Sequence, residues 1–350
     1  MKILLAKLNH LGDTLLLTPT LRRLRAQFPN AQVDVLVRRG CEAMLQGNPD
    51  VNRVVAIAPP EKSRRTLAGG LQDFGAACRA LLFRGYDYAF DLSDSDRAKF
   101  WIFMSLSRTR VVNVAYESRP INRWLFNRLD RFKWAKAHMV LRDYRVVADA
   151  LGLEGEPGPL VFEPQIEKTV LKGRVPDEVL RGGGVIIHPT SRWDSKQWVP
   201  ERWAEVADRL SKQMGVTVAI TGGPAPVEVA HAEAIRSAAR TPIHVLTGRL
   251  SLPETAWVIG SARLFLGVDT VAMHLAAAMQ TPAVALFGST SEWSWHPWQS
   301  EHELVLGDCE CKRPPRNFEC DRSKMFPCMG GISVAQVLRA TENLMDRTIS

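Results

Sequence analysis

The sequence predicts an α/β protein with two parallel sheets, one in each half of the chain. Short continuous apolar runs recur along it, and such runs are typical of parallel strands covered on both faces. Amphipathic helical stretches separate these runs, and the short links between them favour open parallel sheets. The 350 residues are enough for two domains with buried cores, and the 46% apolar and 23% charged residues are typical of a globular protein.

The first half begins with an expected strand at Lys2–Leu8. A helix is expected to follow from Thr14, with apolar residues near the helical period, and to end at Pro29. Asp13 therefore lies just past the carboxyl end of the first strand, where ligands bind to such sheets. The other elements expected in this half are strands at Gln32–Val37, Val54–Ala58, Tyr86–Leu92 and Val111–Ala115 and a helix at His138–Leu151.

A linker rich in Gly, Pro and charge is expected at Leu153–Arg174, with the domain boundary near residue 170. The predicted domains are therefore residues 1–170 and 171–350. Two α/β domains joined in this way are expected to face a central cleft. The second half repeats the alternation, with strands expected at Gly184–His188, Val216–Ile220 and Ile243–Leu246 and helices at Pro200–Met214, Val229–Arg240 and Leu252–Gly260.

The stretch Leu264–Ser291 reads as a strand, a Gly-Val-Asp-Thr turn, a helix of small residues and a second strand. The Thr270 hydroxyl can cap this helix, and free N–H groups at its start favour an anion such as phosphate. His274 lies four residues further on, so it and Thr270 can face one ligand together with the neighbouring Asp269. An ordinary βαβ unit with a capped helix and a core histidine would give the same pattern.

Two other groups of polar residues follow predicted strands. Asp13 comes after a glycine at a strand-to-helix turn, so its carboxylate can act as a general base or can simply cap the helix. Thr190, Ser191 and Lys196 follow the strand Gly184–His188. Two hydroxyls and an ammonium can hold a phosphate and neutralise a departing diphosphate, although polar loops after strands are common.

Charge is unevenly distributed in a chain whose net charge is +8. Arg119–Arg145 holds eight Lys/Arg against two Asp, with aromatic residues between them. Such a segment suits membrane lipid or nucleic acid, or it is a solvated helix face over buried aromatics. No zinc-finger spacing or RNP signature favours nucleic acid. No run of about 18 apolar residues predicts a membrane span, and the first apolar run is too short for a secretory signal, so a cytoplasmic location is expected.

Four of the six cysteines lie at Cys309-x-Cys311-x8-Cys320-x7-Cys328. This spacing is not a pair of CxxC motifs, so it supports a zinc site only weakly. Disulfides are not expected in a reducing cytoplasm, and free thiols in a loop are the alternative.

Together these stretches resemble the lipopolysaccharide heptosyltransferases, glycosyltransferase family 9. The resemblance rests on GDTLLLTP (Gly12–Pro19), HPTSRWDSKQW (His188–Trp198) and GVDTVAMHLAAAMQTPAVALFGST (Gly267–Thr290), together with FPNAQVDVLV and NPDVNRVV in the first half. Their order and spacing span nearly the whole chain. SRWDSKQW and WSWHPW (Trp293–Trp298) look most like the heptosyltransferase III branch.

The resemblance implies a GT-B fold, in which two Rossmann-like domains bind the acceptor on the first and the nucleotide sugar on the second. The last helix, about Val334–Arg347, is expected to pack back on the first domain. The general base of the family falls on Asp13. The residues expected to hold the donor are Thr190, Ser191, Lys196, Asp269, Thr270 and His274, with Glu228 near the ribose although Pro224-Ala225-Pro226 changes the spacing there.

The implied reaction transfers L-glycero-D-manno-heptose from ADP-heptose to the inner core of lipopolysaccharide, with inversion and without a metal or other cofactor. The acceptor is a lipid-linked, anionic lipid A-core saccharide, so peripheral contact with the cytoplasmic face of the inner membrane is expected, and nucleic acid is not. The residues expected to bind the acceptor are Lys62, Arg64, Arg65, Arg119 and Arg123. The alternatives are a GT-B enzyme with another donor, a nucleotide-sugar epimerase, or a non-catalytic protein that binds sugar nucleotides.

Overall fold

The computed structural model describes residues 1–58, 67–113, 122–130, 136–308 and 326–349. The chain divides into two compact units, Met1–Glu163 and Pro164–Ser350. The division falls inside the Gly- and Pro-rich stretch Leu153–Arg174. Each unit is described by itself below.

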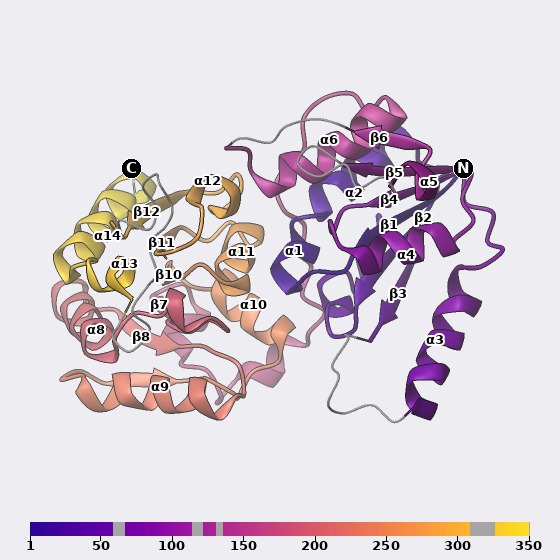
Figure 1. The fold of residues 1–350 in the computed structure, drawn as a ribbon. Coiled ribbons are helices and arrows are strands. Elements are labelled where there is room, and N and C mark those ends of the chain that lie inside the picture. Colours follow the sequence, from indigo (N-terminus) through magenta and orange to yellow (C-terminus); the bar gives the residue numbers. More distant parts are fainter. Residues whose placement is uncertain (59–66, 114–121, 131–135, 309–325, 350) are drawn as a thin grey trace. The chain divides into compact units, whose positions relative to one another are not determined.

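The first unit contains a six-stranded parallel sheet with strand order β3-β2-β1-β4-β5-β6 (Figure 1). The strands are β1 (Lys2–Lys7), β2 (Gln32–Arg38), β3 (Arg53–Ile57), β4 (Tyr88–Asp91), β5 (Thr109–Asn113) and β6 (Arg128–Asp130). The chain crosses from one side of β1 to the other between β3 and β4. The carboxyl ends of β1 and β4 therefore form the switch point, where open α/β sheets bind their ligands.

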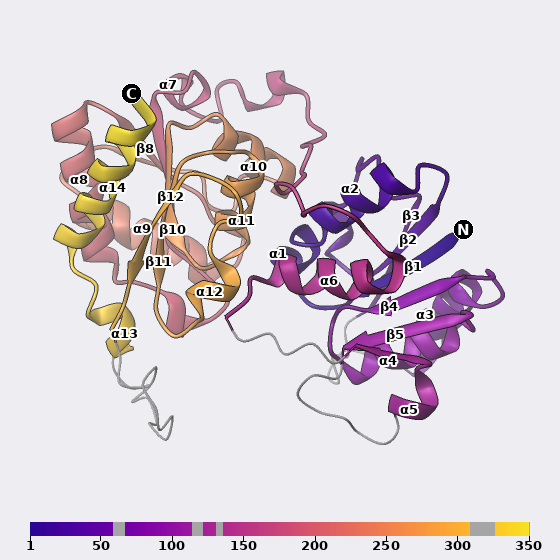
Figure 2. The ribbon, with the colours of Figure 1, turned by 90° about the horizontal axis from the view of Figure 1, so that it is seen from above.

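Helices cover both faces of this sheet (Figure 2). Ile3 and Leu5 pack into a core with α2 and α6, whereas Leu4 and Ala6 pack into a second core with α3 and α4. Successive strand residues point to opposite faces, so a strand buried on both sides reads as one continuous apolar run. The helices of this unit are α1 (Leu11–Leu15), α2 (Thr18–Gln27), α3 (Leu67–Leu81), α4 (Asp96–Met104), α5 (Asn122–Leu125) and α6 (Met139–Leu151), with a 3-10 turn at Glu42–Met44.

The single helix expected from Thr14 is in fact two, because α1 ends at Leu15 and α2 begins at Thr18. Pro19 occupies the first turn of α2. Proline has no N–H group to donate to the preceding turn, so it suits a helix start and interrupts a continuous helix.

The second unit repeats the same strand topology, with the order β12-β11-β10-β7-β8-β9 and parallel pairing throughout. Its strands are β7 (Gly184–His188), β8 (Thr217–Ile220), β9 (Ile243–Val245), β10 (Leu264–Val268), β11 (Ala283–Phe287) and β12 (His302–Leu306). Here β7 and β10 flank the switch point. The two six-stranded parallel sheets confirm the predicted α/β class with two Rossmann-like domains.

The helices of the second unit are α7 (Asp177–Leu180), α8 (Pro200–Met214), α9 (Pro226–Ala238), α10 (Leu252–Gly260), α11 (Val271–Ala278), α12 (Glu292–Trp295), α13 (Pro327–Gly330) and α14 (Val334–Ile349), with 3-10 turns at Lys168–Leu171 and Asp194–Lys196. Helix α14 packs against α8, β11 and β12 of its own unit (Figure 1). Arg347 Nη2 also lies 2.8 Å from Glu303 Oε1 of β12. The expected packing of α14 against the first unit stays a prediction. None of the described helices combines the length and the apolar character that a membrane span needs.

Candidate functional site

An ion pair joins the two strands at the switch point of the second unit. Lys196 Nζ lies 2.6 Å from Asp269 Oδ2, and the two side chains are 17% and 6% exposed. Lys196 ends the 3-10 turn after β7, and Asp269 directly follows β10. Because β7 and β10 are neighbours in the sheet, residues 73 positions apart in sequence meet at one edge. An ammonium has three donors, so Lys196 can contact an anion while it stays paired with Asp269.

A second cluster forms after β7 and β8. Glu228 Oε2 accepts hydrogen bonds from Thr190 Oγ1 at 2.8 Å and from the backbone N–H of Gly223 at 2.9 Å. Glu228 lies in the first turn of α9. A Cβ atom on Gly223 would lie 2.6 Å from Glu228 Oε1, so only glycine allows this carboxylate to approach the backbone so closely. Two of the predicted donor-site residues, Thr190 and Glu228, are thus brought into direct contact.

Three buried polar side chains near this cluster were not predicted from the sequence. His188 Nδ1 and Thr221 Oγ1 lie 3.0 Å apart at the ends of β7 and β8. Burial lowers the pKa of His188 to about 4, against a smaller opposing effect of Glu228, so the imidazole is neutral near pH 7. Thr247, which follows β9, has a buried Oγ1 with no hydrogen-bond partner in the described part of the chain. The signal for all three was a polar residue at or just after the end of a buried strand.

The loop that carries Ser191 is held by its own polar groups. Ser191 Oγ accepts from the Trp193 N–H at 3.3 Å, and its carbonyl accepts from Gln197 Nε2 at 2.9 Å. Ser191 therefore shapes the loop between β7 and Lys196, whether or not its hydroxyl also contacts a ligand.

The start of α11 differs in one respect from the prediction. Thr270 occupies the N-cap position with an extended backbone, but its hydroxyl makes no capping hydrogen bond, so the predicted side-chain cap is wrong. The Met273 N–H, which such a hydroxyl would engage, instead donates to the backbone carbonyl of Thr270 at 3.2 Å. His274 is 3% exposed, and its ring lies 6.4 Å from that of Trp295 in α12. The Trp-rich stretch after β11 thus packs beside the helix that begins at the switch point.

In the first unit, Asp13 lies in α1, just beyond the carboxyl end of β1, and is 9% exposed. Its Oδ2 accepts from the backbone N–H of His10 at 3.1 Å. The capping role left open by the sequence is therefore present, and the role of general base stays a prediction.

The chain between β1 and α1 is fastened to the end of β4. Ser93 Oγ accepts from the Leu8 N–H at 2.6 Å and donates to the Ala6 carbonyl at 3.0 Å. The Ser93 N–H donates in turn to Asp91 Oδ1 at 2.9 Å. Beside this clamp, Lys7 Nζ lies 2.6 Å from Asp143 Oδ2, and both side chains are 1% exposed. The Ser93 hydrogen bonds thus hold the segment that leads to Asp13 against the ends of β1 and β4, the two strands of the switch point.

Comparison with known proteins identifies the family. The model of glycosyltransferase family 9 (heptosyltransferase) matches residues 75–324, which is more than half of the chain. The chain belongs to glycosyltransferase family 9. It is therefore a glycosyltransferase, as predicted.

Individual relatives agree with this assignment. Lipopolysaccharide heptosyltransferase 3 of Escherichia coli is 28% identical over 349 residues, which cover 95% of this chain and 96% of that protein. The glycosyl transferase family 9 structure from Veillonella parvula DSM 2008 has a TM-score of 0.80 at 19% identity and covers 99% and 97% of the two chains. The E. coli heptosyltransferase WaaC with ADP has a TM-score of 0.76 at 19% identity and covers 98% and 100%. The last two matches show that the fold is the predicted GT-B fold.

The predicted acceptor residues of this family 9 enzyme are not among the side chains that the structure describes. Lys62, Arg64, Arg65 and Arg119 lie outside the described residues, and only the backbone of Arg123 in α5 is described. In the same segment Trp124 is 85% exposed and Phe126 is 2% exposed, so the predicted basic aromatic stretch combines surface and core residues.

The metal hypothesis rests on cysteines that are also mostly outside the described residues. Cys309, Cys311 and Cys320 are among these, whereas Cys328 is buried in α13. Across the described ranges, no group of three His, Cys, Asp or Glu side chains is arranged to hold a metal ion.

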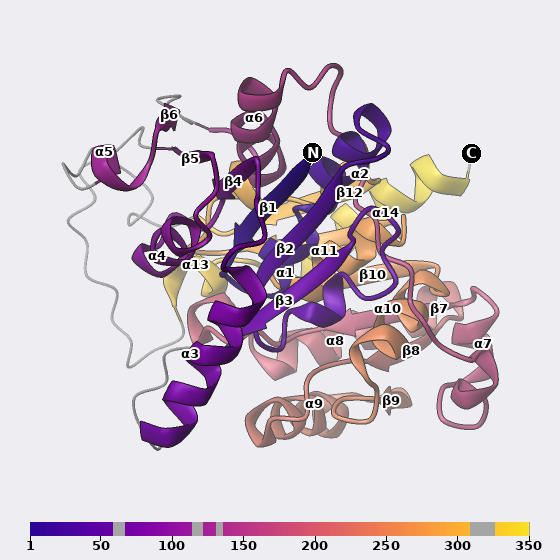
Figure 3. The same cartoon turned by 90° about the vertical axis from the view of Figure 1, so that its right-hand side faces the viewer.

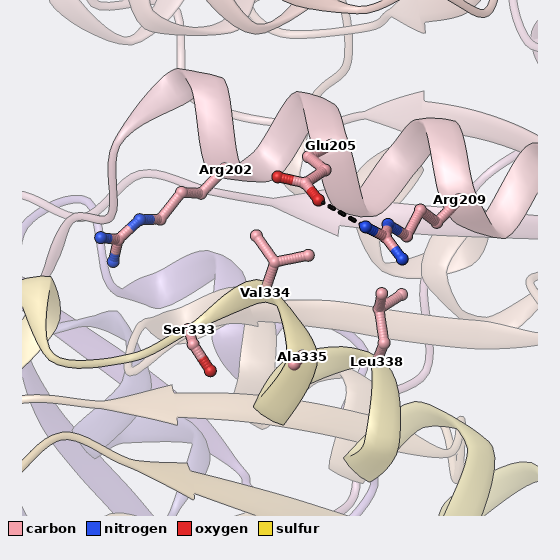
Figure 4. Close-up of a pocket in the computed structure, with 7 residues that line it drawn as sticks. All are labelled: Arg202, Glu205, Arg209, Ser333, Val334, Ala335 and Leu338. Atoms are coloured by element: carbon pink, nitrogen blue, oxygen red, sulfur yellow. Dashed lines mark hydrogen bonds and ion pairs between the residues drawn. The ribbon is translucent and has the colours of Figure 1, made fainter.

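A separate pocket in the second unit of the enzyme includes none of the predicted site residues. It lies between α8 and the start of α14 (Figure 4). Arg202 Nη1 donates to the carbonyls of Gly330 and Ile332 at 2.7 and 2.6 Å, and Arg209 Nη2 donates to Glu205 Oε1 at 2.9 Å. Since both guanidinium groups already bind protein acceptors, the pocket is part of the packing between these helices. It is lined by Arg202, Glu205, Arg209, Ser333, Val334, Ala335 and Leu338.

Proposed function

We propose that this family 9 enzyme transfers L-glycero-D-manno-heptose from ADP-heptose to the inner core of lipopolysaccharide, with inversion at the anomeric carbon. The observation that carries the proposal is the Lys196–Asp269 ion pair at the switch point of the second unit. Its ammonium supplies hydrogen-bond donors where a diphosphate is expected to bind. Membership of family 9, the full-length match to lipopolysaccharide heptosyltransferase 3 and the fold shared with WaaC, which was solved with ADP, support the choice of sugar and nucleotide.

The second unit would bind ADP-heptose. Lys196 would neutralise the diphosphate, and Thr190, Ser191 and the start of α11 after Asp269 and Thr270 would supply further polar contacts. Glu228 would accept from the ribose hydroxyls, with its Oε2 fixed by Thr190 and Gly223. His274 would bind beside Thr270 on the same helical face.

The chemical step would be a direct displacement. The acceptor hydroxyl attacks the anomeric carbon while Asp13 takes its proton, and the bond from that carbon to the diphosphate oxygen breaks. Attack and departure on opposite faces invert the configuration. The charge that develops on ADP would be met by Lys196, and one such contact typically supplies about 3–4 kcal/mol of transition-state stabilisation. Positive groups of the protein would take the place of a divalent metal, so we propose that the enzyme needs none.

The acceptor would be the anionic, lipid-linked core saccharide at the cytoplasmic face of the inner membrane, with no role for nucleic acid. Lys62, Arg64, Arg65, Arg119 and Arg123 would bind its phosphate groups, because arginine and lysine pair strongly with phosphate. SRWDSKQW and WSWHPW support the heptosyltransferase III branch for this enzyme.

The test is a donor panel with purified enzyme and core acceptors from heptose-deficient strains, analysed by mass spectrometry. We expect ADP-heptose alone to add one heptose, and EDTA to leave the rate unchanged. Preferential transfer from another nucleotide sugar, epimerisation of the donor, or binding of ADP-heptose without transfer to any core acceptor would overturn the proposal. Loss of transfer in EDTA that is restored by a divalent cation would overturn the metal-independent mechanism alone.

A further inference from the structure

Large apolar side chains are exposed in one segment of the first unit. Apart from Met1, every exposed large hydrophobic residue in the described part of this unit lies between positions 74 and 124. These residues and their exposed fractions are Phe74 (44%), Phe83 (87%), Phe100 (42%), Phe103 (40%), Leu106 (55%) and Trp124 (85%). We call them the α3–α4 face.

The residues of the α3–α4 face come from elements that share one core. Helices α3 and α4 pack on the same side of the sheet, and Leu125 and Phe126 at the end of α5 join that core (Figure 2, Figure 3). The rings of Phe74 and Phe100 lie 6.2 Å apart, which ties α3 to α4 at the surface. The helices on the opposite side of the sheet, α2 and α6, have no exposed large hydrophobic residue among their described side chains.

Two of these residues have an unfavourable backbone conformation. Phe83 follows α3 with φ of 57°, and Leu106 follows α4 with φ of 52°. Glycine or asparagine is usual in this left-handed region, and a bulky residue there is strained. Neither residue gains core packing in return, because each is more than half exposed. The fold therefore keeps a phenylalanine and a leucine in water at positions where smaller polar residues would fit better.

The α3–α4 face also lies in the most basic part of the chain. Residues 59–135 contain fourteen Lys/Arg and eight Asp/Glu, a surplus of six in a chain whose net charge is +8. Arg79, Arg84 and Arg108 are exposed in the same segment, and the guanidinium carbon of Arg110 lies 5.9 Å from the ring centre of Phe103. Exposed aromatics interspersed with arginines suit the headgroup region of an anionic bilayer.

We propose that the α3–α4 face docks the enzyme on the surface of an anionic lipid bilayer. Apolar rings enter the headgroup region, and the arginines pair with lipid phosphates. This proposal rests on the proposed function at one point. A lipid surface is chosen as the partner of the face because the proposed acceptor is linked to lipid. In sequence, Arg65 lies two positions before α3, and Arg123 lies beside Trp124.

Binding to vesicles of phosphatidylglycerol and phosphatidylethanolamine, compared with phosphatidylcholine, tests this proposal. One variant combines Phe83→Asn with Leu106→Asn, which removes apolar surface and suits the left-handed backbone, so it should fold at least as well as the parent. A second combines Phe103→Ser with Trp124→Ser. The matched control combines Val227→Ser with Leu306→Ser, two residues of the second unit that are 65% and 44% exposed.

We expect the parent and the control to bind anionic vesicles, and we expect salt to weaken this binding. Each face variant should bind at least about tenfold more weakly than the parent. Activity on a delipidated acceptor should be unchanged in the face variants. Absent binding by the parent, equal binding by parent and face variants, or a parent dimer that the face variants convert to monomer without any vesicle binding would overturn the proposal. The two proposals fail separately, since an enzyme that transfers another sugar can still bind vesicles through this face, and one that transfers heptose can fail to bind them.

Discussion

Lys196 and Asp269 are paired at 2.6 Å across the switch point of the second sheet, and Asp269 is almost fully buried. This carboxylate fixes the ammonium where two neighbouring strands end. It also reduces the net positive charge available to a ligand, so the pair acts as a positioned donor of hydrogen bonds more than as an isolated cation. Replacement of Lys196 and replacement of Asp269 should therefore have different consequences.

Replacement of Lys196 by Ala should lower turnover by about two to three orders of magnitude, because the developing charge on the leaving diphosphate loses its contact. It should also destabilise the protein, since the buried Asp269 carboxyl group loses its partner. Steady-state kinetics and thermal unfolding measure the two effects. Lys212→Ala, at an exposed position of α8, is the control and should change neither. Normal turnover in Lys196→Ala would remove this residue from the mechanism.

Replacement of Asp13 by Asn should lower turnover by orders of magnitude while donor binding stays nearly intact, because an amide cannot take a proton from the acceptor hydroxyl. The amide oxygen can still accept from the His10 N–H, so the helix cap survives. Asp13→Ala removes the cap as well and should cost about 1 kcal/mol of stability in addition. Calorimetry with ADP and initial rates separate the roles. Equal rates in Asp13→Asn and the parent would leave Asp13 with the cap alone.

Much of the fold could be predicted from the sequence because a strand that is buried on both faces appears there as a continuous run of apolar residues. Ile3, Leu4, Leu5 and Ala6 alternate between two cores, and together they form the apolar run that predicted β1. The short strand β6 (Arg128–Asp130) has no such run, and it was missed because its pairing with β5 comes from tertiary contacts.

The candidate site was predictable in its positions and less so in its contacts. Lys196 and Asp269 follow strands of the second sheet, and Asp13 follows a strand of the first. Residues that follow parallel strands lie at the carboxyl edge of their own sheet, so these positions could be predicted. The contact between Thr190 and Glu228 joins residues 38 positions apart and depends on how β7 and β8 pair. The failed cap at Thr270 depends on a competing backbone carbonyl, which propensity alone does not reveal.

Replacement of Gly223 by Ala should weaken ADP binding by roughly tenfold, an effect of about 1.4 kcal/mol. The new Cβ would lie 2.6 Å from Glu228 Oε1, so the carboxylate must move away from Thr190. Titration calorimetry with ADP measures the loss. Gly158→Ala, at a glycine with open space around its Cβ position, is the control. If both variants bind ADP as the parent does, Glu228 does not contribute to the nucleotide site in its observed position.

Asp91 should make the stability of the first unit depend on pH. Its carboxyl is buried at the end of β4, and burial raises its pKa to about 7, although the Ser93 N–H and Lys99 oppose this. The unfolded chain loses the same proton near pH 3.8. Between these values the folded protein binds more protons than the unfolded one, so stability is greatest below the lower value and falls as pH rises through 7. A rise of about 3 units sets an upper limit of about 4 kcal/mol.

Replacement of Asp91 by Asn fixes a neutral side chain that can still accept from the Ser93 N–H, so this part of the pH dependence should disappear. Urea unfolding from about pH 5 to about pH 8 should show the parent losing stability relative to Asp91→Asn as pH rises, with the two most alike at the acidic end. Asp177→Asn, at an exposed position of α7, should follow the parent throughout. Parallel curves for Asp91→Asn and the parent would mean that the Asp91 carboxyl keeps an ordinary pKa inside the fold.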